Sequence, residues 1–125
     1  MGDWDMKQIR GALNHRTGLT AEACVAAHCL RRGWELVAER WRGGGGEIDL
    51  VARDGDEFVF IEVKKSSSFA RAASRVSERQ IARLMAAASE FMGLLPDGQN
   101  TPVRFDVALV DGMGRIEILE NALAP

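Results

Sequence analysis

The chain of 125 residues is poor in the two residue types that most often build metal centres, cysteine and histidine. Its two cysteines, Cys24 and Cys29, are five positions apart within a helical pattern, a spacing that keeps their sulfur atoms apart. No histidine and cysteine cluster surrounds them, which excludes a disulfide framework and a zinc site and indicates small hydrophobic side chains. His15 and His28 have no partner pattern either, so we expect neither to bind a metal ion.

Long apolar runs are also absent. No stretch of about 18 apolar residues occurs, which excludes a transmembrane helix. The polar start of the chain lacks the apolar core of a signal peptide, so we expect a cytoplasmic protein with no membrane partner. The glycines at 43–46 are not followed by a Lys-Ser or Lys-Thr pair, so they do not predict a P-loop.

A chain of this length is expected to form one domain with its own core. Residues 1–16 lack a clean period and are expected to form an N-terminal arm before a single domain over residues 17–125. The predicted elements are a helix from Thr17 or Thr20 to Arg32, strands at 34–41, 46–53 and 57–64, a helix from a Ser77–Gln80 capping box to Gly93, and strands at 103–109 and 115–119. Residues 66–75 are expected to form a loop, with a helical turn within it as the alternative. This order, αβββαβ with one further strand, indicates an α/β fold with a mixed sheet flanked by helices.

Two neighbouring strands carry the most informative pattern. Residues 46–53 and 57–64 alternate in character and are joined through Asp54-Gly55, a strong hairpin signal. Side chains two positions apart share a face of a strand, which puts three acids and one lysine on one side of this hairpin: Glu47, Asp49, Glu62 and Lys64. A four-residue loop sets Asp49 directly opposite Glu62. A two-residue loop at Asp54-Gly55 shifts the pairing register by two residues, so each side chain stays on the same face of the hairpin.

Two interpretations of this charged face stay open. Charged side chains are ordinary on the solvated face of an antiparallel hairpin. However, Val51, Phe58 and Phe60 accompany the charges, which indicates that the face is partly covered. Carboxylates on a partly covered face are costly unless they are paired or bind a hard cation, so the pattern favours a functional site.

The segment Gly-Glu-Ile-Asp-Leu-Val-Ala at residues 46–52, followed by Val-Phe-Ile-Glu-Val-Lys at 59–64, resembles the signature of the YraN family of small bacterial proteins. The resemblance extends from about Gly18 to Ala122. That family is placed among the restriction-endonuclease-like PD-(D/E)xK nucleases, close to Holliday-junction resolvases, which implies an αβββαβ core. Its members are largely predicted nucleases, so the resemblance speaks more strongly for the fold than for the activity.

The resemblance implies a metal-dependent endonuclease that hydrolyses phosphodiester bonds of structured or branched DNA with Mg²⁺ or Mn²⁺. Asp49 matches the metal-binding aspartate, while Glu62 and Lys64 match the (D/E)xK pair. Glu22 matches the first-helix acid of the resolvase-like branch, with a helix first-turn acid as the alternative. We expect the Val63 carbonyl to join the metal ligands, because it lies between Glu62 and Lys64, and Lys64 to orient the attacking water.

Basic residues gather after this segment. Residues 64–83 contain six basic residues and one acid, whereas residues 84–125 contain two basic residues and six acids. The residues predicted to contact phosphate or the nucleic-acid strand are Lys65, Arg79, Gln80 and Arg83. The alternative for the arginine row is a solvated helix face.

The chain departs from the family pattern at three positions. Ser66 lies two residues beyond the lysine, where a basic residue is usual. Gln80 replaces the lysine that commonly opens the next helix, and Arg40 takes the place of the usual asparagine. None of these changes removes the acids or the lysine, and all three bear on substrate contacts.

Two other function classes stay open. A non-catalytic nucleic-acid-binding module on the same fold predicts salt-sensitive binding that is indifferent to Mg²⁺. A partner-binding protein would use the acidic C-terminal region. The Asp-Glu-Lys set favours the enzyme, because a pure binder has no need of carboxylates beside phosphates. Resolvase-like relatives act as dimers, and the edge strands leave room for a homodimer. Glu47 is expected to be an outer group around the metal ion or an acid at the strand edge. Asp106 is expected to support the metal ligands from outside or only to face a helix.

Overall fold

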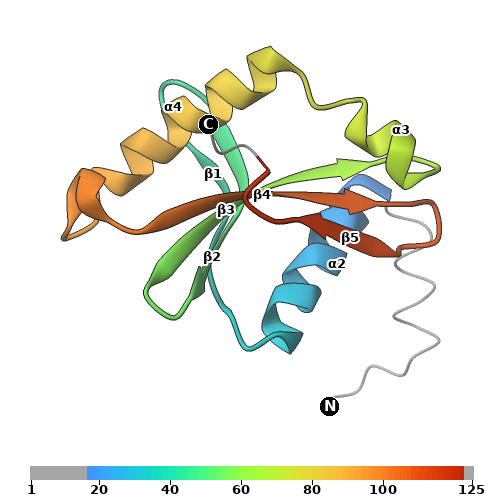
Figure 1. The fold of residues 1–125 in the computed structure, drawn as a ribbon, viewed down its shortest axis with the longest axis horizontal. Coiled ribbons are helices and arrows are strands. Elements are labelled where there is room, and N and C mark those ends of the chain that lie inside the picture. Colours follow the sequence, from blue (N-terminus) through green and yellow to red (C-terminus); the bar gives the residue numbers. More distant parts are fainter. Residues whose placement is uncertain (1–16, 123–125) are drawn as a thin grey trace.

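A computed structural model of the chain describes residues 17–122. The arm predicted over residues 1–16 lies outside them. The described elements are α2 (Thr17–Arg31), β1 (Glu35–Arg42), β2 (Glu47–Asp54), β3 (Glu57–Lys65), α3 (Phe69–Ala73), α4 (Glu78–Met92), the 3-10 helix η1 (Gly98–Asn100), β4 (Val103–Val110) and β5 (Ile116–Leu119) (Figure 1). This order confirms the predicted α/β fold with an αβββαβ core, and the boundaries of the predicted helices and strands agree within about three residues. The helix α3 lies within the segment predicted as a loop at 66–75, and Ser68 caps its start by accepting a hydrogen bond from the N–H of Arg71.

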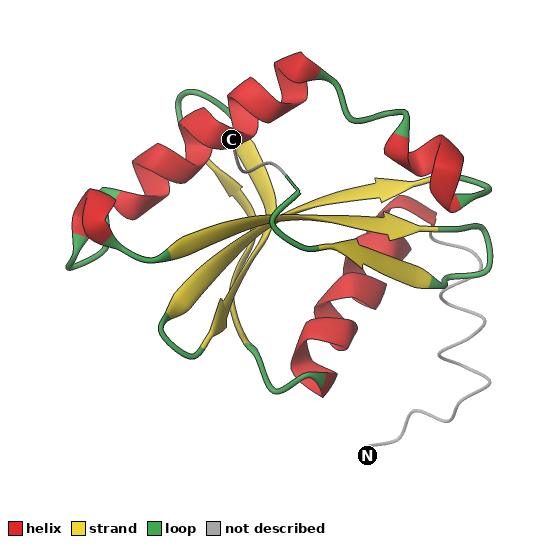
Figure 2. Ribbon diagram, viewed as in Figure 1, coloured by secondary structure: helices red, strands yellow, loops and turns green. Residues whose placement is uncertain are grey.

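The five strands form one mixed sheet in the order β1-β2-β3-β4-β5. All neighbours are antiparallel except β3 and β4, which are parallel. Parallel neighbours need a crossover connection, and the segment with α3 and α4 supplies it. Figure 2 shows the sheet between α4 on one side and α2 on the other. No helix within residues 17–122 is long and apolar enough to cross a membrane.

Both faces of the central hairpin are covered by helices. On one face α2 packs through Val25 and Cys29 against Leu50 and Ile61. The residues that α4 buries with the other face of the hairpin include Leu84, Ala88, Phe91, Val51 and Phe60. The charged face predicted from the sequence is therefore partly covered, as the accompanying apolar residues indicated.

The two long helices begin and end as their sequences predict. Gly33 has a φ of 83° after the last turn of α2, and the N–H of Trp34 donates to the carbonyl of Cys29 at 3.0 Å. This is a Schellman ending, which favours glycine because L side chains rarely adopt a positive φ. At the start of α4, Ser77 and Gln80 form the predicted capping box.

The turn between β2 and β3 lies one residue further along than the two-residue loop expected at Asp54-Gly55, so that expectation is wrong. Asp54 pairs with Glu57, and the loop residues are Gly55 and Asp56. The physical reason is that this loop needs a positive φ at its first position, and Gly55 supplies it with a φ of 62°. The resulting register is the one expected from a longer loop, with Asp49 opposite Glu62.

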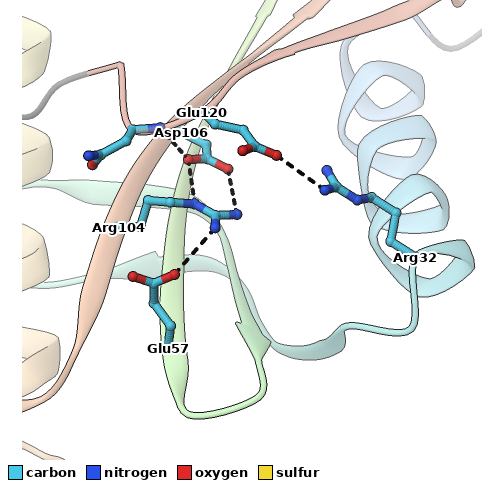
Figure 3. Close-up of polar contacts among 6 residues, drawn as sticks. Arg32, Glu57, Arg104, Asp106 and Glu120 are labelled. Atoms are coloured by element: carbon cyan, nitrogen blue, oxygen red, sulfur yellow. Dashed lines mark hydrogen bonds and ion pairs between the residues drawn. The ribbon is translucent and has the colours of Figure 1, made fainter.

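An ion-pair network anchors β4 on the side of the sheet that faces α2 (Figure 3). The carboxylate of Asp106 is fully buried and accepts hydrogen bonds from Arg104 Nε at 3.0 Å and Nη2 at 3.2 Å. It also accepts from the backbone N–H of Asn121 at 2.8 Å, while Arg104 Nη1 donates to Glu57 at 3.3 Å. The network therefore ties the segment after β5 to the middle of the sheet.

Asp106 does not join the charged face of the hairpin. It pairs with Ile61, which belongs to the cluster beneath α2, so its side chain lies on the α2 side. On this side Arg32, the residue that follows α2, also pairs with Glu120 at 3.2 Å (Figure 3). Of the two roles considered for Asp106, the structure supports a position facing a helix.

We expect Asp106→Ala to lower the free energy of unfolding by about 3 kcal/mol, because it leaves the largely buried Arg104 without its main partner. The double variant Arg104→Met/Asp106→Leu removes both charges and should lose less stability. Urea denaturation of both variants measures the difference. A double variant less stable than Asp106→Ala would contradict this account.

Candidate active site

The hairpin brings together three of the four predicted catalytic residues. Leu50 pairs with Ile61, so the next position places Asp49 on β2 opposite Glu62 on β3. The backbone N–H of Val63 donates to Asp49 Oδ2 at 2.8 Å, which holds the aspartate carboxylate against the neighbouring strand. Lys64 shares the face of Glu62, and its Nζ lies 3.1 Å from Glu62 Oε1. Two carboxylates and one ammonium group thus lie on the same side of the hairpin.

The ion pair between Glu62 and Lys64 is largely shielded from water. Only 14% of the Glu62 side chain and 15% of the Lys64 side chain are exposed. An ion pair with so little solvent gains from its Coulomb attraction but bears a desolvation cost for both groups. Each charge therefore depends on the other, and removal of either one leaves a poorly solvated partner.

The carboxyl group of Asp49 is electrostatically strained. Burial and the nearby Glu62 carboxylate raise the pKa of Asp49 to about 7, against the opposing effect of the hydrogen bond from Val63. Glu22 adds to the rise and Lys64 opposes it. A carboxyl group that holds its proton near neutral pH is a common property of functional sites.

A cavity of about 200 Å³ opens above these residues and is lined by Glu47, Asp49, Glu62, Gln80 and Arg83. The last two lie on the N-terminal half of α4, so the helix forms the wall that faces the hairpin. Gln80 Oε1 accepts a hydrogen bond from the N–H of Ser77 at 3.1 Å. Its amide NH₂ group is therefore the part of Gln80 that remains to serve as a donor in the cavity.

A close contact between β2 and α4 sets the width of this cavity. Gly46 is buried immediately before β2, and a Cβ at this position would collide with the backbone carbonyl of Arg83. Because glycine has no side chain, β2 can begin at Glu47 in direct contact with α4. The absence of a side chain at Gly46 thus keeps the carboxylates close to Arg83.

Two of the residues predicted to contact nucleic acid lie elsewhere. Arg79 is exposed on α4 and does not line the cavity. Lys65 follows Lys64 on β3 and therefore points to the opposite face. There, burial raises the pKa of the half-buried Cys24 thiol, and the charges of Arg31 and Lys65 act to lower it. Cys24 itself is a free thiol, in agreement with the exclusion of a disulfide.

Glu22 lies close enough to raise the pKa of Asp49, but its carboxylate is bonded to Arg40. Arg40 Nε donates to Glu22 Oε2 at 2.8 Å, and this pairing raises the pKa of the guanidinium. Arg40 lies across from Asp49 in the β1–β2 register and has a φ of 51°, which is rare for a residue with a side chain. From the sequence, Arg40 stands out only as a departure from the family pattern, because the sequence reveals neither its backbone φ nor its partner Glu22.

The donor set suits a hard divalent cation through two carboxylates. Asp49 and Glu62 offer the oxygen ligands that Mg²⁺ prefers, and such ions usually keep several waters. Within residues 17–122, no three acidic, histidine or cysteine side chains converge as a ready-made metal cluster. Val63 contributes its N–H to Asp49, while metal ligation by its carbonyl and by Glu22 stays a prediction.

Comparison with known proteins places the chain among bacterial relatives of similar length. The model of the uncharacterised protein family UPF0102 matches residues 21–110, which include both cavity walls. A UPF0102 protein of Ruegeria pomeroyi is 61% identical over 113 residues, covering 90% of this chain and 92% of the relative. One from Cereibacter sphaeroides is 60% identical over 116 residues, covering 93% and 99%. One from Dinoroseobacter shibae is 44% identical over 115 residues, covering 92% and 86%.

The raised pKa of Asp49 predicts a pH-dependent stability in the absence of divalent ions. In the unfolded chain the carboxyl group of Asp49 loses its proton at about pH 4, whereas in the folded protein it keeps the proton up to about pH 7. The free energy of unfolding therefore falls as the pH rises between these two values. Asp49→Asn keeps an acceptor for the Val63 N–H and removes the titration. We therefore expect the variant to gain stability over the wild type as the pH is raised from about 5 to about 8.

Urea denaturation in EDTA at several pH values measures this difference. Asp56→Asn, the same chemical change at the exposed hairpin tip, is the control and should run parallel to the wild type. Parallel curves for Asp49→Asn and the wild type would show that Asp49 has an ordinary pKa.

Proposed function

This chain belongs to the uncharacterised protein family UPF0102, also called the YraN family, and from its site we propose that it is a metal-dependent nuclease acting on structured or branched DNA. The observation that carries the proposal is the pair of carboxylates on adjacent strands, Asp49 opposite Glu62, with Lys64 on the same face. Phosphodiester hydrolysis needs an oriented water and compensation of negative charge, and these three groups are suited to both tasks.

The electrostatic strain at the carboxylates supports a cation as their natural partner. Burial, and after it the repulsion between the Asp49 and Glu62 carboxylates, raises the pKa of Asp49 to about 7. A divalent ion held by both carboxylates would relieve this repulsion. When bound, Mg²⁺ or Mn²⁺ would supply charge neutralisation at the phosphorus centre and at the leaving oxygen.

The chain's own residues would position the reacting groups. Lys64 Nζ, held beside Glu62, can donate a hydrogen bond to the attacking water or to a phosphate oxygen as negative charge develops. Gln80 and Arg83 line the opposite wall and supply donors for the other phosphate oxygens. Gln80 lies in the first turn of α4, where the helix dipole favours an anion.

One observation favours a second candidate, a non-catalytic nucleic-acid-binding module. Glu22 is paired with Arg40 rather than with the two carboxylates of the cavity, and Glu62 is paired with Lys64. A site that binds phosphate only through basic groups needs no divalent ion. The two candidates differ in their dependence on metal and on Glu62, which makes them separable by experiment.

We expect the wild type to cleave at least one member of a labelled panel (four-way junction, flap, duplex and single strand) with Mg²⁺ or Mn²⁺. Glu62→Gln and Lys64→Met should lower the cleavage rate by about 100-fold or more, because each removes a group that acts on the reacting atoms. Glu117→Gln, on the exposed side of β5, is a control that should cleave like the wild type.

Single-turnover cleavage followed on denaturing gels measures these rates. Cleavage that persists in Glu62→Gln would trace the activity to a contaminant or to another site. Equal binding without cleavage in the wild type and both variants would replace the nuclease with the binding module.

We also expect one Mn²⁺ per chain, because the pairing of Glu22 with Arg40 leaves Asp49 and Glu62 as the two acids that can share an ion. Asp49→Asn should weaken binding by more than about tenfold, since loss of even an outer partner of a metal ligand costs that much. Titration calorimetry gives both numbers, with Asp56→Asn as the matched control. Two ions per chain, or undiminished binding in Asp49→Asn, would refute this arrangement.

A further inference from the structure

A second cavity, of about 460 Å³, opens beside the acidic one. It is lined by Arg42, the glycines at 43–46, Glu47 and Arg83. Glu47 and Arg83 also line the acidic cavity, so the two spaces adjoin along the start of β2. We refer to the segment 43–46 as the glycine loop.

The amides of the glycine loop already hold an anion, which is a side chain of the protein itself. The N–H of Gly44 donates to Glu90 Oε2 at 2.9 Å, and the N–H of Gly45 donates to Glu90 Oε1 at 2.8 Å. Successive backbone N–H groups that converge on one negatively charged group form the kind of concave anion site that also binds phosphates. The two oxygens of Glu90 occupy positions that two oxygens of a phosphate can take.

The glycines are required for this close approach. A Cβ at Gly43 would collide with the carboxylate of Glu90, and a Cβ at Gly45 would lie 2.9 Å from that of Ala86 on α4. Side chains at these positions would push the loop away from the helix and from any anion in its cradle. The run of glycines, which does not match a P-loop in sequence, is therefore suited to bind an anion through its backbone.

Positive charge flanks the cradle on both sides. Arg83 is exposed on α4, and no ion pair between residues 17 and 122 involves it. Arg42 pairs with Glu47 at 2.9 Å, but its side chain is 78% exposed. An exposed pair of this kind contributes little stability, so Arg42 can exchange Glu47 for another anion at small cost.

We propose that the glycine loop and Arg83 form a second phosphate site, which binds the phosphate next along the strand from the one in the acidic cavity. The proposal rests on the proposed function and extends it to the path of the substrate. The strand runs from the acidic cavity past Arg83 along the glycine loop towards Arg42, and the phosphate displaces Glu90 from the amides of Gly44 and Gly45.

A purely structural role for Glu90 leads to the opposite expectation. If Glu90 only ties the loop to α4, its neutralisation loosens the loop and weakens any binding nearby. If Glu90 competes with the substrate phosphate, its neutralisation removes a rival negative charge and strengthens binding. The sign of the change therefore separates the two roles.

The test measures the affinity of the full chain for a fluorescent single-stranded octanucleotide by anisotropy in EDTA, over a range of NaCl concentrations. We expect Glu90→Gln to bind about fivefold more tightly, because a like charge next to the ligand is removed. Arg83→Gln should bind more weakly, with a salt dependence reduced by about 0.7 in the log–log slope, the value for one lost contact to a single strand.

Two variants control for general effects of charge. Asp97→Asn neutralises an exposed acid beyond the end of α4, and Arg31→Gln neutralises an exposed base at the end of α2. Both should bind within about twofold of the wild type, because neither lies on the proposed strand path. A gain in affinity with Asp97→Asn equal to the gain with Glu90→Gln would overturn the second phosphate site. Weaker or unchanged binding by Glu90→Gln would overturn it as well.

A second measurement on the wild type covers the case in which a variant does not fold. Titration with inorganic pyrophosphate should shift the amide NMR signals of Gly44 and Gly45, and unchanged signals would overturn the proposal. Both measurements are made without divalent ions, so they do not depend on cleavage. If the binding results agree with these expectations but the protein cleaves none of the substrates, the second phosphate site is supported and the proposed nuclease activity is refuted.

Discussion

The site depends above all on the pairing register of β2 and β3. This register sets Asp49 opposite Glu62, and the hydrogen bond from the Val63 N–H to the Asp49 carboxylate holds the two strands together at that point. A slip of one residue would turn every side chain of one strand to the other face and separate the carboxylates. The helices that cover both faces of the hairpin make such a slip costly, because it would turn charged side chains of one strand into the apolar cluster beneath α2.

Helix α4 supplies the second half of the site, and its position is set by small residues and by a carboxylate. Gly46 lets β2 begin in contact with the backbone of Arg83, and Glu90, about two helical turns further along α4, holds the glycine loop. The same helix buries Phe91 against Phe60 and Trp41, with ring centroids 5.8 Å and 5.3 Å apart. Packing of the apolar stripe thus fixes where the polar stripe of α4 meets the hairpin.

Charge balance at the site is only partly achieved within the chain. Lys64 compensates Glu62, and Arg40 compensates Glu22, but Asp49 has no cation as its direct partner among residues 17–122. Burial, and after it the nearby Glu62 carboxylate, raises the pKa of Asp49. A buried carboxylate without a cationic partner costs stability, and this cost supports the proposal that the site binds a cation.

The sequence by itself determined the order of the strands and long helices, the ends of these helices and the shared face of Asp49, Glu62 and Lys64, because these depend on local periodicity and on capping. It predicted a hairpin but placed the two-residue loop one position early, since only the positive φ of Gly55 settles where the turn lies. The tertiary structure decided the rest. Arg40 meets Glu22, and Glu90 meets the glycine loop, across 18 and 46 positions of the chain. Such contacts arise from the packing of helices on the sheet, and no local pattern encodes them.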